Sequence, residues 1–202
     1  MIETEVKIHW QGTALEAFAL IESKGYTMRK VRTLEIDQIY DRGLGELREA
    51  GKLLRLRRTG SGIDALEKNA TITYKGPAEV GRYKSREEIE FFVDDAENCV
   101  LVLDRLGYQP AFRYEKFRTM YWKEGEPGVI TVDETPMGVF VELEGGKDWI
   151  DSAAERLGAG VSQYITASYA SLYREYRQGN KVLPPDMVFP DEAFRKTRAK
   201  LP

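Results

Sequence analysis

Residues 2–9 read IETEVKIH, and this stretch decides the fold. Apolar and charged side chains alternate along it, so successive residues point to opposite faces, as the period of two in a β-strand requires. One face carries Ile2, Thr4, Val6 and Ile8, and the other carries Glu3, Glu5, Lys7 and His9. The stretch is therefore predicted to be a strand with one apolar face and one charged face.

Similar strand-like stretches recur seven times along the chain, at residues 32–40, 52–58, 70–76, 85–93, 113–122, 128–134 and 138–145. A capping box of Thr13 and Glu16 predicts a helix that ends at Gly25, and Asp94 or Asp95 caps a second helix that ends near Gly107. Two further helices are expected at about 148–157 and 166–178. Eight short strands with few helices predict an α+β fold dominated by antiparallel sheet, closed or nearly closed.

The domain organisation follows from the length of 202 residues, which fits one domain with an appendage. We expect the domain to cover residues 1–178. Gly179 begins a tail, residues 179–202, that contains four of the eight prolines of the chain. This tail is either a mobile appendage or a clasp on the domain.

Composition excludes several classes of protein. Hydrophobic residues make up 42% of the chain, enough for a core. Thirty Lys and Arg against thirty-three Asp and Glu leave a net charge of -3, so binding to nucleic acid through bulk charge is not expected. No apolar run approaches the roughly 20 residues that span a bilayer, and acids at Glu3 and Glu5 argue against a leader peptide. We expect a cytoplasmic protein that binds no membrane.

A single cysteine, Cys99, excludes an internal disulfide and a cysteine-rich zinc site. A single histidine, His9, excludes any site that needs two. No nucleophile-elbow motif accompanies His9, so a Ser-His-Asp hydrolase is set aside.

Charged residues of both signs share one face of the predicted sheet. Like charges recur two residues apart on single strands, as in Glu3/Glu5 and Arg55/Arg57, where neighbours lie about 7 Å apart and repel unless a ligand separates them. The bases of this face are Lys7, Arg55, Arg57, Lys75, Arg86, Lys116 and Arg118. The acids are Glu3, Glu5, Glu88, Glu90, Asp133, Glu142 and Glu144.

One ligand satisfies both signs of charge, namely a polyphosphate that carries a divalent metal. Its oxygens would contact the bases, and Mg²⁺ or Mn²⁺ would bridge those oxygens to the acids. If the sheet closes into a barrel of about eight strands, this face becomes a charged cavity and the apolar face lies under the helices.

These residues resemble the CYTH superfamily, the triphosphate tunnel metalloenzymes. Glu3-x-Glu5-x-Lys7 is similar to its ExExK signature, and its later blocks are similar to DQIYD (37–41), LLRLRR (53–58), TYKGP (73–77), SREEIE (85–90), EKFR (115–118), VDETPMGVFVELEG (132–145) and SYASLY (168–173). The likeness covers about residues 1–178 and is closest to class IV (CyaB-type) adenylyl cyclases. It implies an eight-stranded antiparallel β-barrel with a hydrophilic tunnel.

The resemblance also implies roles for individual residues. Glu3, Glu5 and Glu144 would hold the catalytic metal, with Asp133 and Glu142 as further or second-metal ligands. The tunnel bases Lys7, Arg55, Arg57, Lys75, Lys116 and Arg118, with Arg86 beside them, would bind substrate. Lys7, Lys75 and Arg118 would also be catalytic, and Tyr40 could assist attack by water. Glu88 and Glu90 would bind metal-coordinated water or balance charge.

Three functions stay open at this point. A cyclase would convert ATP to cyclic AMP and pyrophosphate, and two blocks, TYKGP and GYQPAFRYEKFR, favour it. A triphosphatase would hydrolyse tripolyphosphate, thiamine triphosphate or nucleotides. A binding module would hold polyphosphate or nucleotide without turnover, which the seven carboxylates argue against. Homodimerisation is a further expectation, although no apolar stripe is assigned to it.

Overall fold

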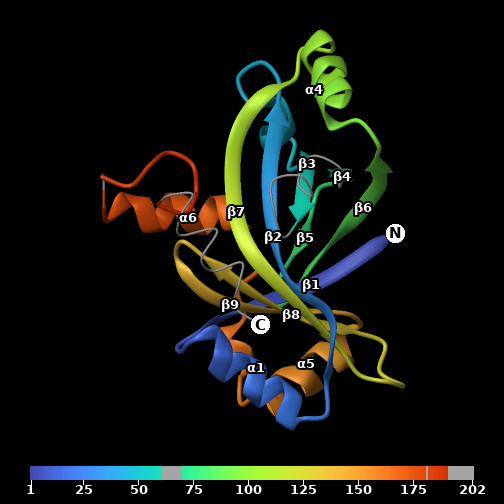
Figure 1. Cartoon of the computed structure of the whole chain (residues 1–202), viewed down its shortest axis with the longest axis vertical. Helices are drawn as coiled ribbons and strands as arrows, with labels where there is room; N and C mark the ends of the chain where they lie inside the picture. The colour runs from blue at the N-terminus through green and yellow to red at the C-terminus, as the bar shows by residue number, and fades with distance from the viewer. Residues whose placement is uncertain (61–69, 181, 191–202) are drawn as a thin grey trace.

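A computed structural model describes residues 1–60, 70–180 and 182–190. Its strands form one sheet that curves round on itself, and helices pack outside it (Figure 1). The strands are β1 (Ile2–Trp10), β2 (Thr27–Asp41), β3 (Leu53–Gly60), β4 (Ala70–Lys75), β5 (Glu79–Val80), β6 (Lys84–Val93), β7 (Gln109–Trp122), β8 (Val129–Thr135) and β9 (Gly138–Glu144). The helices are α1 (Ala14–Ser23), α2 (Glu46–Glu49), α4 (Ala96–Arg105), α5 (Lys147–Arg156) and α6 (Tyr169–Gln178), with a 3-10 turn η1 (Val161–Gln163).

The sheet closes into a barrel. Its strand order is β1-β9-β8-β7-β2-β3-β4-β6, and β6 pairs back with β1, where Glu3 lies opposite Arg86. Every pairing between the strands named above is antiparallel, and the two-residue β5 adds to β6 outside the ring. The predicted α+β fold with a closed, eight-stranded antiparallel barrel is confirmed.

The outer face of the barrel is apolar where helices cover it. Val6 and Ile8 of β1 pack with Phe18 and Ile21 of α1 and with the buried Ile150 of α5. The capping box that positions α1 is present, because the Thr13 hydroxyl accepts from the Glu16 amide at 3.3 Å and Glu16 Oε2 accepts from the Thr13 amide at 2.7 Å. The period of two therefore sends the charged residues of β1 inward.

Helices α4 and α6 cover other parts of the barrel. Asp95 caps α4, whose Leu103 packs with Leu56 of β3 and Ala70 of β4. The single cysteine, Cys99, is partly buried against the same cluster. Helix α6 contributes Tyr169 and Tyr173 to a third cluster, together with Tyr114, Phe140 and Met187.

The structure departs from the predicted elements in places. Strand β2 begins at Thr27 rather than near Arg32, because its first residues pair with the far end of β7. The loop after β2 contains the short helix α2, which was not expected. Residues 61 and 62 of the predicted turn after β3 lie outside the described residues.

Residues 182–190 of the predicted tail lie against β7. The Met187 amide donates to the Arg113 carbonyl at 3.0 Å, and the Glu115 amide donates to the Met187 carbonyl at 2.8 Å. Phe189 packs on Phe117 with ring centroids 5.3 Å apart. This part of the tail clasps the barrel; residues 191–202 are outside the described residues.

Over the residues that the structure describes, no helix combines the length and the apolar character needed to cross a membrane.

Candidate active site in the barrel interior

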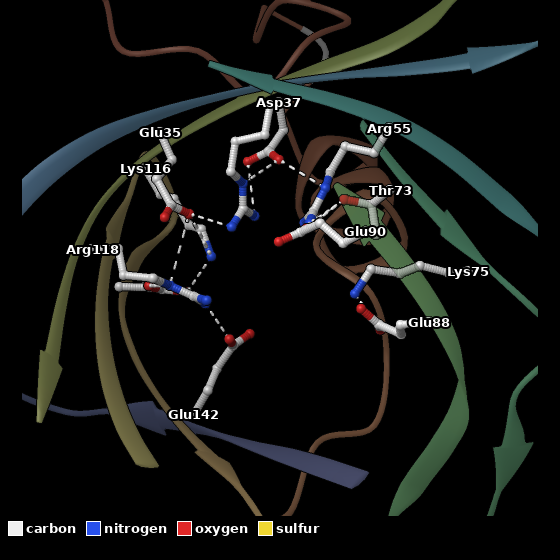
Figure 2. A network of polar contacts seen from close by, with 12 residues as sticks. Glu35, Asp37, Arg55, Thr73, Lys75, Glu88, Glu90, Lys116, Arg118 and Glu142 are labelled. Atoms are coloured by element: carbon white, nitrogen blue, oxygen red, sulfur yellow. Dashed lines mark hydrogen bonds and ion pairs between the residues drawn. The ribbon is translucent and has the colours of Figure 1, made fainter. Parts of the chain in front are cut away.

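Charged side chains from all eight strands of the ring meet inside the barrel. Figure 2 shows ten labelled residues, most of them charged, pointing from the surrounding strands toward a common centre. Most of these side chains are deeply buried, and Asp37 and Asp133 have no exposed surface. Burial of so many charges is stable only because each sign lies beside the other.

In the wall formed by β2 and β3, two arginines form ion pairs with carboxylates. Arg57 Nε lies 2.8 Å from Asp37 Oδ1, and its Nη1 lies 3.0 Å from Glu35 Oε2. Arg55 Nε lies 3.3 Å from Asp37 Oδ1, and its Nη2 lies 3.1 Å from Glu90 Oε2. Burial works against the charge of Arg57, but the two carboxylates beside it raise its pKa well above the usual value. Both guanidinium groups stay charged at every relevant pH.

The adjacent wall of β7 and β8 is organised around Asp133. Lys116 Nζ donates to Asp133 Oδ2 at 2.8 Å, and Arg118 Nε donates to Asp133 Oδ1 at 2.6 Å. The hydroxyl of Tyr169 donates to Oδ2 of the same carboxylate at 2.7 Å. Arg118 reaches further and also contacts the Glu142 carboxylate of β9.

Strands β1, β6 and β9 add two more ion-paired carboxylates. Lys7 Nζ lies 3.2 Å from Glu142 and 3.5 Å from Glu5. Lys84 Nζ donates to Glu5 Oε1 at 3.0 Å. Burial opposes the ionisation of Glu5, but Lys7 and Lys84 outweigh it and lower the pKa of Glu5.

A third group joins β4 to β6 and to the first residues of β1. Lys75 Nζ contacts the Glu88 carboxylate and lies 3.9 Å from Glu3. Arg86 Nε lies 3.1 Å from the same oxygen of Glu88. Burial, together with Arg55 and Arg86, lowers the pKa of Lys75 to about 8 despite Glu88.

The carboxylates Glu3, Glu5 and Glu144 are the residues predicted to bind the catalytic metal. Glu5 and Glu144 are directly opposite on β1 and β9. Burial, a hydrogen bond with Glu88 and the charge of Glu144 raise the pKa of Glu3 to about 8, and burial and nearby carboxylates also raise the pKa of Glu144. Carboxylates that resist ionisation for lack of positive charge are suited to a hard cation.

The interior carboxylates of this structure do not surround a common point where a metal ion could bind. Within residues 1–60, 70–180 and 182–190, no three His, Cys, Asp or Glu side chains converge in a geometry that could hold a metal. Lys7 and Lys84 draw Glu5 to themselves, and Lys7 and Arg118 hold Glu142. Ligation by Glu5 therefore requires the exchange of a lysine for the cation.

The prediction that Tyr40 faces the site is wrong. Its neighbour Ile39 pairs with Arg55, whose side chain points inward, so Tyr40 points to the outer face beside Leu54. The Tyr40 ring is buried in the apolar cluster under α4. A side chain held there cannot reach water in the barrel. The predicted charged site residues, in contrast, lie on the inner face, and all except Glu144 make ion pairs there.

Several interior residues were not among the predicted site residues. Glu35 and Asp37 alternate with Leu34 and Ile36, the same two-residue spacing that identified the other acids. Lys84 lies just before the predicted start of its strand at residue 85. Tyr169 carried no such signal, because it comes from a helix.

Comparisons with known proteins agree with this geometry. The family model described as "CYTH domain" matches residues 1–156. The Methanocaldococcus jannaschii protein named "Putative adenylate cyclase MJ0240" is 31% identical over 144 residues, which are 71% of this chain and 75% of that one.

Two solved structures share the fold. A Vibrio parahaemolyticus protein described as a putative adenylate cyclase superposes with a TM-score of 0.73 at 17% identity, over 86% of this chain and 98% of that one. A Hippeastrum protein, described as a putative adenylyl cyclase with a dominant triphosphatase activity, has a TM-score of 0.60 at 16% identity, over 87% of this chain and 95% of that one. At these identities the likeness is one of fold alone.

Proposed function

Because the chain belongs to the CYTH domain family, we propose that it is a divalent-metal-dependent enzyme that cleaves a phosphoanhydride bond of a triphosphate. The observation that supports this proposal is the network of buried acids and bases inside the barrel. Without ligand, these groups neutralise one another. A triphosphate with its cation can replace that pairing without leaving either sign of charge uncompensated.

In this proposal the bases bind the substrate. Arg55 and Arg57 on one wall and Arg118 on the next supply planar guanidinium donors for phosphate oxygens, and Lys116 supplies an ammonium group. Lys7, Lys75 and Arg118 neutralise charge that spreads to the leaving oxygens as the bond breaks. Their acidic partners hold them in place before substrate binds, and the substrate with its cation then replaces these partners.

The residues for the metal are Glu3, Glu5 and Glu144, with Glu142 beside them. When bound, Mg²⁺ or Mn²⁺ supplies charge neutralisation at the phosphate oxygens. The chain itself contributes the carboxylates and the lysines that release them, Lys7 and Lys84.

Two reactions are compatible with this site. An adenylyl cyclase, as the name of the Methanocaldococcus relative suggests, would direct the ribose 3′-hydroxyl at the α-phosphorus of ATP. A triphosphatase, as the description of the Hippeastrum protein suggests, would direct water at a terminal phosphorus. The cation-lined cavity described below does not distinguish the two reactions, because ATP and tripolyphosphate both carry phosphates that cations bind.

Phosphorus NMR tests the proposal directly. Purified protein is incubated with ATP or tripolyphosphate and Mg²⁺ or Mn²⁺. Cyclic AMP with pyrophosphate identifies a cyclase, and orthophosphate identifies a hydrolase. Resonances that shift without new products, with every metal, would contradict an enzymatic function. Arg57→Lys is the companion variant, because it keeps a positive charge but loses the two-sided contact with Glu35 and Asp37.

A further inference from the structure

A cavity of about 1270 Å³ lies where α6 meets the starts of β3 and β7. It is lined in part by Lys84 and Arg86, whose side chains also contact the interior carboxylates Glu5 and Glu88. The cavity therefore shares Lys84 and Arg86 with the candidate active site. Its volume exceeds the range of about 300–1,000 Å³ that is usual for small-molecule pockets.

Four further bases line the outer part of this cavity, and we call them the rim cations: Arg48, Lys52, Arg174 and Arg177. Arg48 and Arg177 donate to the backbone carbonyls of Leu44 and Leu183. In the part of the chain that the structure describes, none of the four has a carboxylate oxygen within 4 Å.

The acidic residue in the cavity lining, Asp41, interacts with Arg48, but Lys52, Arg174 and Arg177 have no ion-paired carboxylate among the described residues. Asp41 accepts from the backbone amides of Arg42 at 2.8 Å, Leu47 at 2.9 Å and Arg48 at 3.1 Å, which fixes its carboxylate on the loop. The rim thus differs from the barrel interior, where the bases are paired with acids. Like charges gathered without counter-charge raise the local potential and attract anions.

We propose that the rim cations form a subsite for phosphate groups that continue beyond the triphosphate, so that the protein binds linear inorganic polyphosphate of more than three units. This subsite rests on the proposed triphosphate site but not on which reaction follows. The interior bases suffice for a triphosphate, so the positive charge at the rim is available for further anionic groups. Arg174 and Arg177 lie beyond residue 156, outside the region that the family model matches.

Calorimetric titrations without divalent metal test the subsite, because no turnover then interferes. The ligands are tripolyphosphate, a length-fractionated longer polyphosphate, and ATP. The variant is Lys52→Gln with Arg174→Gln, since neither side chain makes a hydrogen bond within the described residues. Lys24→Gln with Arg105→Gln is the matched control, which removes the same two charge types from exposed positions elsewhere.

For the wild type, we expect the longer polyphosphate to bind about tenfold or more tightly than tripolyphosphate. The rim variant should lose most of this length preference, while its affinity for tripolyphosphate should stay within about twofold of the wild-type value. The control variant should keep both the length preference and the tripolyphosphate affinity. Equal weakening toward both phosphates would overturn the proposal, because it would indicate long-range attraction. A retained length preference, or a loss confined to ATP, would also overturn it.

The same titrations separate this proposal from the proposed function. If tripolyphosphate neither binds the wild type in these titrations nor is turned over with Mg²⁺ or Mn²⁺, while longer polyphosphate binds in a manner that depends on Lys52 and Arg174, the triphosphate site fails and the rim subsite stands. If tripolyphosphate binds and the length preference is absent, the triphosphate site stands and the rim subsite fails.

Discussion

Tyr169 of α6 donates a hydrogen bond of 2.7 Å to the Oδ2 atom of Asp133, a carboxylate of β8 with no exposed surface. Lys116 donates to the same oxygen at 2.8 Å, and Arg118 donates to both oxygens at 2.6 and 2.5 Å. Oδ2 accepts three of these hydrogen bonds and Oδ1 accepts one, so four donors already surround the carboxylate. We therefore predict that Asp133 holds Lys116, Arg118 and helix α6 in place and does not bind a second metal.

Replacing Tyr169 with Phe tests the helix contact. Burial and the neighbouring carboxylates raise the pKa of Tyr169 well above its usual value, so the hydroxyl is always a donor. Its removal should lower the free energy of unfolding by about 1.5–3 kcal/mol, as for other hydrogen bonds to charged groups. Chemical denaturation measures the change. Tyr176→Phe is the control, because Tyr176 is exposed on the same helix, and equal stability of the two variants would disprove the contact.

Asp133→Asn separates the two roles of the carboxylate. The variant leaves Lys116 and Arg118 without their main buried partner, which should cost about 3–5 kcal/mol of stability. The number of Mn²⁺ ions bound should not change, as counted by electron paramagnetic resonance at a temperature where the variant is folded. A folded variant that binds one ion fewer would restore Asp133 to the metal ligands.

The contacts of Glu126, which lies far from the barrel interior, predict that the stability of the protein depends on pH. It accepts from the Tyr26 hydroxyl at 2.7 Å, the Trp149 indole at 2.7 Å and Arg156 at 2.8 Å, and thereby ties α5 to the β7–β8 turn. Partial burial opposes its charge, but these donors lower its pKa below the usual value.

A lowered carboxylate pKa contributes stability above the ordinary pKa of about 4.3, and this contribution disappears as the pH falls through the folded-state value. Glu126→Gln should therefore lower the free energy of unfolding by about 1–3 kcal/mol at pH 7 and by less at pH 4. Denaturation curves at the two pH values measure the difference. Glu124→Gln, an exposed neighbour, should change neither value, and a pH-independent loss in Glu126→Gln would contradict the linkage.

Much of the site followed from one property of the sequence, the period of two along each strand. It placed Glu3, Glu5 and Lys7 inside the barrel because Val6 and Ile8 belong to the outer core. The same rule applied to β2 finds Glu35 and Asp37, so these residues were within reach of sequence reasoning.

The cross-strand register could not be predicted from the sequence. Tyr40 was assigned to the site from the family resemblance, although the period of two that points Glu35 and Asp37 inward points Tyr40 outward, where it pairs with Leu54. Which base contacts which acid depends on the same register. The Tyr169 contact depends on where a helix enters the barrel, and no local pattern records that.

The carboxylates Glu5 and Glu144 face each other across β1 and β9. Their environments nevertheless predict that replacing each carboxylate with a neutral amide has opposite effects on the melting temperature. Lys84 at 3.0 Å and Lys7 at 3.5 Å hold Glu5 ionised, whereas burial raises the pKa of Glu144, which has no ion-pair partner among the described residues. In the presence of EDTA at pH 7, Glu5→Gln should lower the melting temperature and Glu144→Gln should raise it. Each change should be about 2–4 °C, the effect of about 1 kcal/mol in a domain of this size.

The same melting temperatures are then measured with Mg²⁺ or Mn²⁺ in place of EDTA. The melting temperature of the wild type should rise with metal, because a ligand that binds only the folded state stabilises the folded state. Both variants should lose most of this gain, and with it metal-dependent turnover, because each lacks one proposed ligand. Glu22→Gln on α1 is the control and should behave as the wild type toward metal. A full metal-dependent gain in both Glu5→Gln and Glu144→Gln would remove these two carboxylates from the metal site, whichever direction their melting temperatures move without metal.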